Sequence, residues 1–216
     1  MTKKNNVVLF DLDGTLVDSN QIIIDSLKAT FDRFLPNHTL KDDDFIQMIG
    51  PTLEQSFRRF FDNTKMIDQM VSYYRDFYKN NEDSSIDIYP GVIETLETLK
   101  SKGTIIAIVT SKYKKGAEYS INKFNINHYI DYYCYLDDVQ KPKPDREPID
   151  YILHQLTDYD KAIMVGDNKS DILSGKAAGI LAAGVDWSLK PDLLKSAKPD
   201  FWLYKISDII DIIKKI

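Results

Sequence analysis

Val7-Val8-Leu9-Phe10-Asp11-Leu12-Asp13-Gly14-Thr15 carries the strongest structural signal in this 216-residue chain. Its four apolar residues, two of them β-branched, predict a short strand buried on both faces, and Gly14 predicts a turn. Two carboxylates so close repel each other, by roughly 4 kcal/mol for charges ~4 Å apart at an effective dielectric of ~20. Because ligands bind at the carboxyl ends of strands in open parallel sheets, Asp11 and Asp13 are predicted to form a functional site.

A second Asp-x-Asp pair occurs at Asp42 and Asp44. It follows Lys41 and precedes Phe45 and Ile46, so it is typical of a solvated helix start favoured by the helix dipole. Only the first pair is therefore a candidate for chemistry.

The composition, 43% hydrophobic and 28% charged, is that of an ordinary soluble protein. A net charge of −5 argues against a basic nucleic-acid-binding face. The single cysteine, Cys134, excludes an internal disulfide and is predicted to be a buried, inert thiol in a strand. Because no apolar run is long enough for a signal peptide or a membrane span, we expect a cytoplasmic protein without a membrane partner.

Apolar runs at 105–109, 162–165 and 180–185 alternate with helical patterns, which predicts a parallel sheet with helices on both faces. Residues 16–85 break this alternation, because their apolar residues recur at helical spacing with no convincing strand. The predicted fold is α/β, with a Rossmann-like parallel-sheet core and a small all-helical cap domain inserted after the first strand.

The predicted domain bounds follow from this break in pattern. The core takes residues 1–15 and 86–216, and the cap takes residues 16–85. Within the cap, a helix is predicted at 53–61, and the polar segment 80–85 is predicted to be a flexible return linker.

Chemically useful side chains follow the other predicted strands. Thr110 comes directly after the run 105–109, Asp167 follows the run 162–165, and Lys143 lies in a proline-rich loop after a further apolar run. Since the carboxyl ends of parallel strands share one edge of a sheet, these residues should converge with the first aspartate pair.

The charge of that convergence predicts a cation. Four aspartates and one lysine, with a sum of −3, would meet there: Asp11, Asp13, Asp167, Asp171 and Lys143. A divalent cation changes this sum to −1 and can bridge a phosphate oxygen, and hard oxygen ligands favour Mg²⁺. Carboxylates, a lysine and a hydroxyl together therefore indicate phosphoryl transfer.

These motifs resemble the haloacid dehalogenase-like superfamily. Its four signatures occur in order along nearly the whole chain: Asp11-Leu12-Asp13-Gly14-Thr15, Thr110, Lys143, and Gly166-Asp167 with Asp171. The predicted helical insert looks like the family's C1-type cap. Asp13 distinguishes the chain from the founding dehalogenases, so the resemblance favours phosphate chemistry.

The resemblance implies a role for each signature residue. Asp11 would be the nucleophile that becomes an aspartyl-phosphate, and Asp13 would be the general acid and base. Mg²⁺ would be held by the Asp11 carboxylate, the Asp13 backbone carbonyl and Asp167. Thr110 would hydrogen-bond the phosphoryl oxygens and Lys143 would balance their charge, while Asp171 would anchor Lys143 or a metal-bound water.

Two lysines compete for the third signature. Both Lys141 and Lys143 precede prolines. We choose Lys143, because Lys143-Pro144-Asp145-Arg146-Glu147-Pro148 resembles the Lys-Pro-Asp-x-x-Pro form of relatives, and we expect Lys141 to be solvated.

Six further residues are candidates for substrate contact. Three lie beside the predicted core site and three in the predicted cap: Gly14, Ser111 and Lys112, then Gly50, Arg58 and Arg75.

The branch that the chain resembles is that of the phosphoglycolate phosphatases. It implies a Mg²⁺-dependent phosphatase that acts on small phosphorylated metabolites as a monomer or homodimer. The segments 49–53, 136–139 and 163–168 are especially similar to a bacterial inorganic pyrophosphatase of that branch. Phosphoglycolate, pyrophosphate and nucleoside monophosphates all stay open as substrates.

Other functions also stay open. One is a mutase of the β-phosphoglucomutase kind. Another is a phosphoacceptor signalling module without turnover, although such receivers are shorter and lack a helical insert here. A non-catalytic binding protein is disfavoured because all four signatures are intact.

Overall fold

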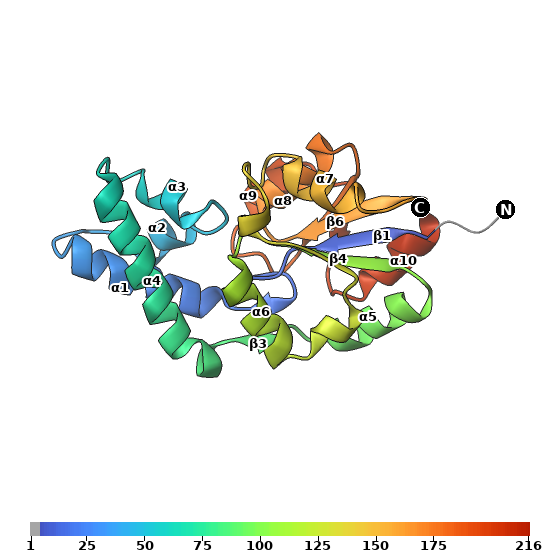
Figure 1. The fold of residues 1–216 in the computed structure, drawn as a ribbon, viewed down its shortest axis with the longest axis horizontal. Helices are drawn as coiled ribbons and strands as arrows, with labels where there is room; N and C mark the ends of the chain where they lie inside the picture. Colours follow the sequence, from blue (N-terminus) through green and yellow to red (C-terminus); the bar gives the residue numbers. More distant parts are fainter. Residues whose placement is uncertain (1–4) are drawn as a thin grey trace. The chain divides into compact units, whose positions relative to one another are not determined.

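A computed structural model describes residues 5–216, which divide into two units. One unit takes the described residues up to Val17 together with Ile88–Ile216, and the other takes Asp18–Asp87 (Figure 1). Each unit is described by itself below.

The larger unit contains a six-stranded sheet in the order β5-β4-β1-β6-β7-β8, with every neighbouring pair parallel (Figure 1). The strands are β1 (Val7–Phe10), β4 (Ile105–Val109), β5 (Tyr132–Cys134), β6 (Ala162–Gly166), β7 (Leu181–Val185) and β8 (Phe201–Leu203). The apolar stretch that precedes Asp11 is thus a central strand, and all four of its residues are buried. The predicted α/β class is confirmed.

Helices lie between these strands: α5 (Val92–Ser101), α6 (Lys114–Lys123), α7 (Glu147–Leu153), α8 (Lys169–Ala177) and α9 (Pro191–Ser196), with the 3₁₀ turns η1 (Ile126–Tyr129) and η2 (Leu136–Asp138). A last helix, α10 (Asp208–Lys215), follows β8. α7 packs on β4 and β5, and α8 packs on β6 and β7. Ile149 and Ile152, one helical turn apart, place α7 over Val7, Leu9 and Val109 in one apolar cluster. This burial holds α7 against one face of the sheet.

Cys134, the last residue of β5, lies in the same apolar cluster. Its thiol is free and buried, and burial raises the pKa of Cys134 to about 12. The prediction of a buried, unreactive thiol is confirmed.

The smaller unit is helical, with α1 (Asn20–Phe34), α2 (Asp42–Ile46), α3 (Leu53–Phe57) and α4 (Thr64–Ser85). α1 packs against α4, and Phe31 is surrounded edge-on by the rings of Phe45, Phe57 and Phe60. The aromatic residues of this segment therefore form a core of their own.

Asp42 begins α2, and the Oδ2 atom of Asp44 accepts a hydrogen bond from the Lys41 backbone N–H at 2.8 Å. The prediction that this second Asp-x-Asp pair is a helix start is confirmed.

Two local predictions were wrong. The segment 80–85 is the last part of α4 and not a flexible linker, because buried Tyr74, Tyr78 and Glu82 continue one helical stripe through it. The helix predicted at 53–61 ends at Phe57, after which the chain tightens into turns with i to i+3 hydrogen bonds.

Two very short strands, β2 (Val17–Asp18) and β3 (Asp87–Ile88), pair with each other and were not predicted. In residues 5–216, no helix combines the length and the apolar composition that a bilayer-spanning helix needs.

Candidate active site

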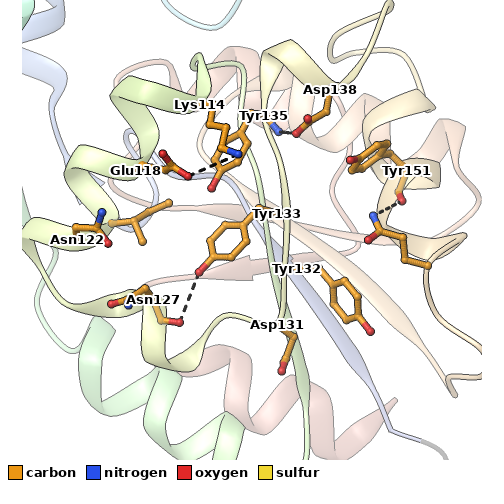
Figure 2. Close-up of a pocket in the computed structure, with 12 residues that line it drawn as sticks. Lys114, Glu118, Asn122, Asn127, Asp131, Tyr132, Tyr133, Tyr135, Asp138 and Tyr151 are labelled. Atoms are coloured by element: carbon orange, nitrogen blue, oxygen red, sulfur yellow. Dashed lines mark hydrogen bonds and ion pairs between the residues drawn. The ribbon is translucent and has the colours of Figure 1, made fainter.

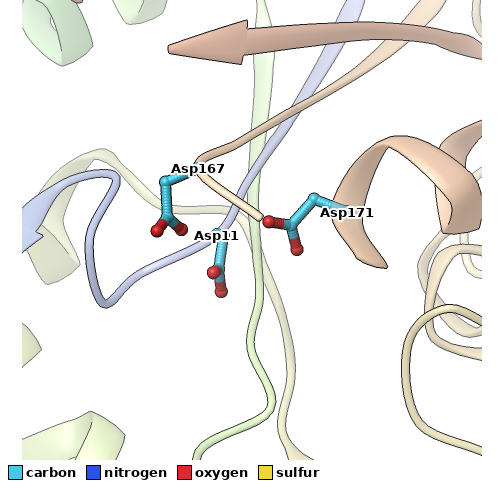
Figure 3. Close-up of side chains that lie close together, drawn as sticks. All are labelled: Asp11, Asp167 and Asp171. Carbon is cyan, nitrogen blue, oxygen red and sulfur yellow. The ribbon is translucent and has the colours of Figure 1, made fainter. Parts of the chain in front are cut away.

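The predicted core residues follow the carboxyl ends of the strands, on the loops that leave them or, for Asp171, in the first turn of the next helix. Phe10 of β1 pairs with Ile108 of β4 and with Val165 of β6. Asp11 therefore leaves the sheet between the loops that begin at Thr110 and Asp167. Figure 3 shows Asp11, Asp167 and Asp171 with their carboxylates close together, Asp171 coming from the first turn of α8.

Lys143 links these loops with one ammonium group. Its Nζ lies 2.9 Å from Asp11 Oδ1 and 2.6 Å from Asp171 Oδ1, and it donates a hydrogen bond to the Val109 carbonyl at 2.9 Å. Burial on its own lowers the pKa of Lys143, but attraction by the two aspartates outweighs it and the pKa is raised. Lys143 is therefore a permanent cation inside the site.

Lys141, the competing lysine, is exposed. Its backbone N–H donates to Glu147 Oε2 at 3.0 Å. This contact fixes the loop and leaves the Lys141 side chain outside the cluster around Asp11.

Three carboxylates crowd together at this edge of the sheet. Oxygen atoms of Asp11, Asp167 and Asp171 all lie within 4.8 Å of one another. Burial, and then the charge of Asp171, raises the pKa of Asp11 to about 7 despite the opposing effect of Lys143. Burial and the two neighbouring carboxylates also raise the pKa of Asp167. Hard oxygen donors that repel one another in this way fit a Mg²⁺ ion.

Gly14 lets the first loop approach Asp167. It has φ +79°, and a Cβ built on it would lie 2.6 Å from Asp167 Oδ2. Thr15, the next residue, points its hydroxyl at Asp167 Oδ1 at 3.4 Å. The glycine of the Asp-x-Asp-Gly-Thr motif thus shapes the acidic cluster itself.

Gly14→Ala is expected to lower the free energy of unfolding by about 1–3 kcal/mol and to abolish stabilisation by Mg²⁺. Alanine is strained at this positive φ, and its methyl group would occupy the space of the Asp167 carboxylate. Gly179→Ala is a matched control, since Gly179 has φ +77° but no atom within 4 Å of the added Cβ. Thermal unfolding with and without Mg²⁺ measures both effects. A Gly14→Ala protein that still gains stability from Mg²⁺ would contradict the assignment.

Asp171 is fixed from two sides. Its Oδ2 accepts a hydrogen bond from the Asn168 N–H at 2.9 Å, which closes a capping box at the start of α8. A Cβ on Gly166 would lie 2.3 Å from the Cβ of Asp171. The glycine before Asp167 therefore makes room for the carboxylate that contacts Lys143.

Ser188 and Lys190 support Asp167 and were not predicted. Ser188 donates its hydroxyl to the Asp167 carbonyl at 2.6 Å and accepts from the Lys190 N–H at 3.0 Å. Both residues are buried, and burial lowers the pKa of the Lys190 ammonium although Asp167 opposes the shift. Since they follow β7, the strand-end argument that selected Thr110 would also have selected them.

The second signature residue, Thr110, and the two candidate substrate contacts that follow it lie together on the loop after β4. Thr110 is buried, while Ser111 and Lys112 are partly buried. The Lys112 ammonium forms an ion pair with Asp13 at 3.1 Å.

The three remaining predicted residues lie in the helical unit. Gly50 adopts φ +110° in the turn before α3. Arg58 is exposed at the end of α3, and Arg75 of α4 lies 3.5 Å from Glu54. Their predicted contacts with a substrate stay predictions.

A separate hollow of about 490 Å³ lies along β5, α6 and α7 (Figure 2). Tyrosine rings form much of its wall, including those of Tyr133, Tyr135 and Tyr151, and none of the predicted site residues lines it. It is therefore distinct from the carboxylate cluster.

The raised pKa of Asp11 predicts how metal-free stability depends on pH. Because the pKa is near its ordinary 3.8 in the unfolded chain and about 7 in the folded protein, stability from this group is lost as pH rises from about 4 to about 7. Asp11→Asn mimics the neutral acid and does not titrate. The free energy of unfolding of Asp11→Asn should therefore exceed that of wild type by an amount that grows from about pH 4 to about pH 7 and then stays constant, at roughly 4 kcal/mol at most. Urea unfolding in EDTA at several pH values checks this, and an advantage independent of pH would contradict it.

Comparison with known proteins gives the family. The profile described as haloacid dehalogenase-like hydrolase matches residues 8–185. The chain is 40% identical over 212 residues to the pyrophosphatase PpaX of Bacillus velezensis, covering 97% of each chain.

Solved structures agree with this match. A haloacid dehalogenase-like hydrolase from Streptococcus pneumoniae superposes with a TM-score of 0.81 at 28% identity, covering 96% of this chain and 98% of that one. A structure described as a predicted phosphoglycolate phosphatase from Haemophilus somnus has a TM-score of 0.83 at 24% identity over 98% and 99% of the chains, a likeness that concerns the fold alone. The family predicted from the four signatures is confirmed: the chain belongs to the haloacid dehalogenase-like hydrolases.

Proposed function

We propose that this chain is a Mg²⁺-dependent phosphatase of small phosphorylated molecules, and that it works through a phosphorylated Asp11. The observation that carries the proposal is the position of Lys143, 2.9 Å from Asp11 and 2.6 Å from Asp171 at the sheet edge where Thr110 and Asp167 also lie. A buried carboxylate beside a permanent cation suits attack on a phosphoryl group, whose charge the cation offsets.

Mg²⁺ would be held by the Asp11 carboxylate, the Asp13 carbonyl oxygen and Asp167. When bound, it offsets the negative charge of the carboxylates and of the phosphoryl group. The same charge would return Asp11 to its ionised form at neutral pH, which nucleophilic attack requires.

In the first step, a carboxylate oxygen of Asp11 attacks the phosphorus atom. The bond between phosphorus and the leaving oxygen breaks, and Asp13 gives its proton to that oxygen. Thr110 donates a hydrogen bond to the phosphoryl oxygens, and Lys143 balances their charge.

In the second step, Asp13 takes a proton from a water molecule that attacks the phosphorus atom. The bond between phosphorus and the Asp11 oxygen breaks, which releases inorganic phosphate and restores both aspartates. General acid–base help of this kind is worth ~10²–10⁴ in rate.

Inorganic pyrophosphate is the substrate to test first. The relative named pyrophosphatase PpaX is 40% identical over 97% of both chains, which makes a shared substrate the best-supported choice. Phosphoglycolate, nucleoside monophosphates and a β-phosphoglucomutase-like reaction are the alternatives that a screen must include.

A phosphate-release assay over these compounds tests the proposal. Wild type with Mg²⁺ should release many phosphates per chain, whereas a signalling module would turn over about once. EDTA should stop the release and added Mg²⁺ should restore it. Absence of turnover on the whole panel, or indifference to EDTA, would contradict the proposal.

A further inference from the structure

We propose that Lys112 is a positioning residue, whose ammonium group holds the carboxylate of Asp13 in the direction that proton transfer needs. The inference rests on the proposed function, in which Asp13 moves the proton in both steps. Lys112 Nζ lies 3.1 Å from Asp13 Oδ1, and the two side chains are only 16% and 19% exposed. Because solvent screens this ion pair less than one on an open surface, it can restrain the Asp13 side chain.

The backbone of Lys112 is fixed on both sides. Its N–H donates a hydrogen bond to the Thr110 hydroxyl at 3.1 Å, and its carbonyl accepts one from the Leu136 N–H at 3.1 Å. The Lys112 side chain therefore starts from a defined point beside a residue of the candidate site.

Helix α6 shapes the path of the Lys112 side chain. Gly116 and Ser120 are four residues apart and so share one face of the helix. A Cβ on Gly116 would lie 3.2 Å from Lys112 Cε, and the Ser120 hydroxyl lies 3.4 Å from Lys112 Nζ. Glycine weakens a helix interior relative to alanine, but here it leaves room for the lysine stem.

This arrangement predicts a specific kinetic effect. A proton donor works only within hydrogen-bond reach of its target, and a misplacement of about 1 Å can cost ~10²-fold in rate. Removing a restraint on Asp13 should lower kcat for every substrate, because the second step is common to all of them. Removing a substrate-binding lysine would instead raise KM, most for substrates with a second anionic group.

The test compares Lys112→Met with wild type on pyrophosphate and on p-nitrophenyl phosphate, which has no second anionic group. We expect kcat to fall about tenfold or more on both, with KM changed less than about twofold, and Lys112→Arg to recover part of kcat. Lys114→Met is the matched control with near wild-type kinetics, since the exposed Lys114 lies near Glu118. Gly116→Val keeps Lys112 but obstructs its aliphatic stem, so it should also lower kcat. This variant provides the test if Lys112→Met does not fold.

Two outcomes would overturn the inference. One is an unchanged kcat in both Lys112→Met and Gly116→Val, and the other is an effect limited to a raised KM for pyrophosphate. The wild-type assay separates this failure from that of the proposed function. If wild type releases no phosphate, both fall, whereas an active wild type with equally active variants removes only the role of Lys112.

Discussion

Asp11→Asn is expected to reduce phosphate release by roughly 10⁴-fold or more while the protein stays folded. An asparagine amide is not nucleophilic enough to open the first step, so neither the phosphorylated intermediate nor its hydrolysis can follow. The fold should survive because asparagine fills the same volume and removes one of three crowded carboxylates. Phosphate release and thermal unfolding, measured on the same preparation, check the two halves of this result.

Asp42→Asn is the matched control for Asp11→Asn. Asp42 belongs to the other Asp-x-Asp pair, is 72% exposed and contacts Lys28 at the surface of the helical unit. Its substitution should leave activity near wild type. Acid quenching of wild type during turnover, followed by peptide mapping, should place the phosphoryl group on Asp11. Turnover that persists in Asp11→Asn, or a phosphoryl group on another residue, would show that the nucleophile is misassigned.

Lys143→Met is expected to lose activity by at least ~10²-fold and to lower the free energy of unfolding at pH 8 by about 3–5 kcal/mol. The lysine contacts two buried carboxylates and the Val109 carbonyl, so its removal leaves like charges facing each other without compensation. The destabilisation should shrink at pH 5, where protonation relieves part of that repulsion. Urea unfolding in EDTA at both pH values measures it.

Lys141→Met separates the loss of this buried cation from a general effect on the loop. Lys141 is exposed, and its backbone rather than its side chain contacts Glu147. Its substitution should change stability by less than about 0.5 kcal/mol. Equal effects of the two substitutions would mean that the third signature residue has been chosen wrongly.

The sheet and the candidate site could be predicted from the sequence because they share one signal. A buried parallel strand is a short apolar run, and the residue after it lies at the common edge. Asp11, Thr110 and Asp167 follow such runs directly or nearly so, and the pairing of β1 with β4 and β6 brings them to that edge. Lys143 could be chosen only through the family resemblance, since its loop has no periodic pattern.

Other features could not be predicted because they depend on tertiary packing. Residues 80–85 are polar in composition, but Glu82 is only 4% exposed and continues the buried stripe of α4. The pairing of Lys112 with Asp13 joins residues 99 positions apart and leaves no local trace. The strands β2 and β3 are too short to have a period.

The single cysteine of this chain is a natural probe of transient opening at the β5 edge of the sheet. Shielded among aliphatic neighbours and scarcely ionised at neutral pH, the Cys134 thiol should resist alkylation by iodoacetamide until β5 detaches from β4. Its modification rate, followed by mass spectrometry, would then measure how often β5 separates from β4. Because the Cys134 carbonyl accepts a hydrogen bond from the Thr110 N–H at 3.0 Å, each such separation would also release the loop that carries Thr110.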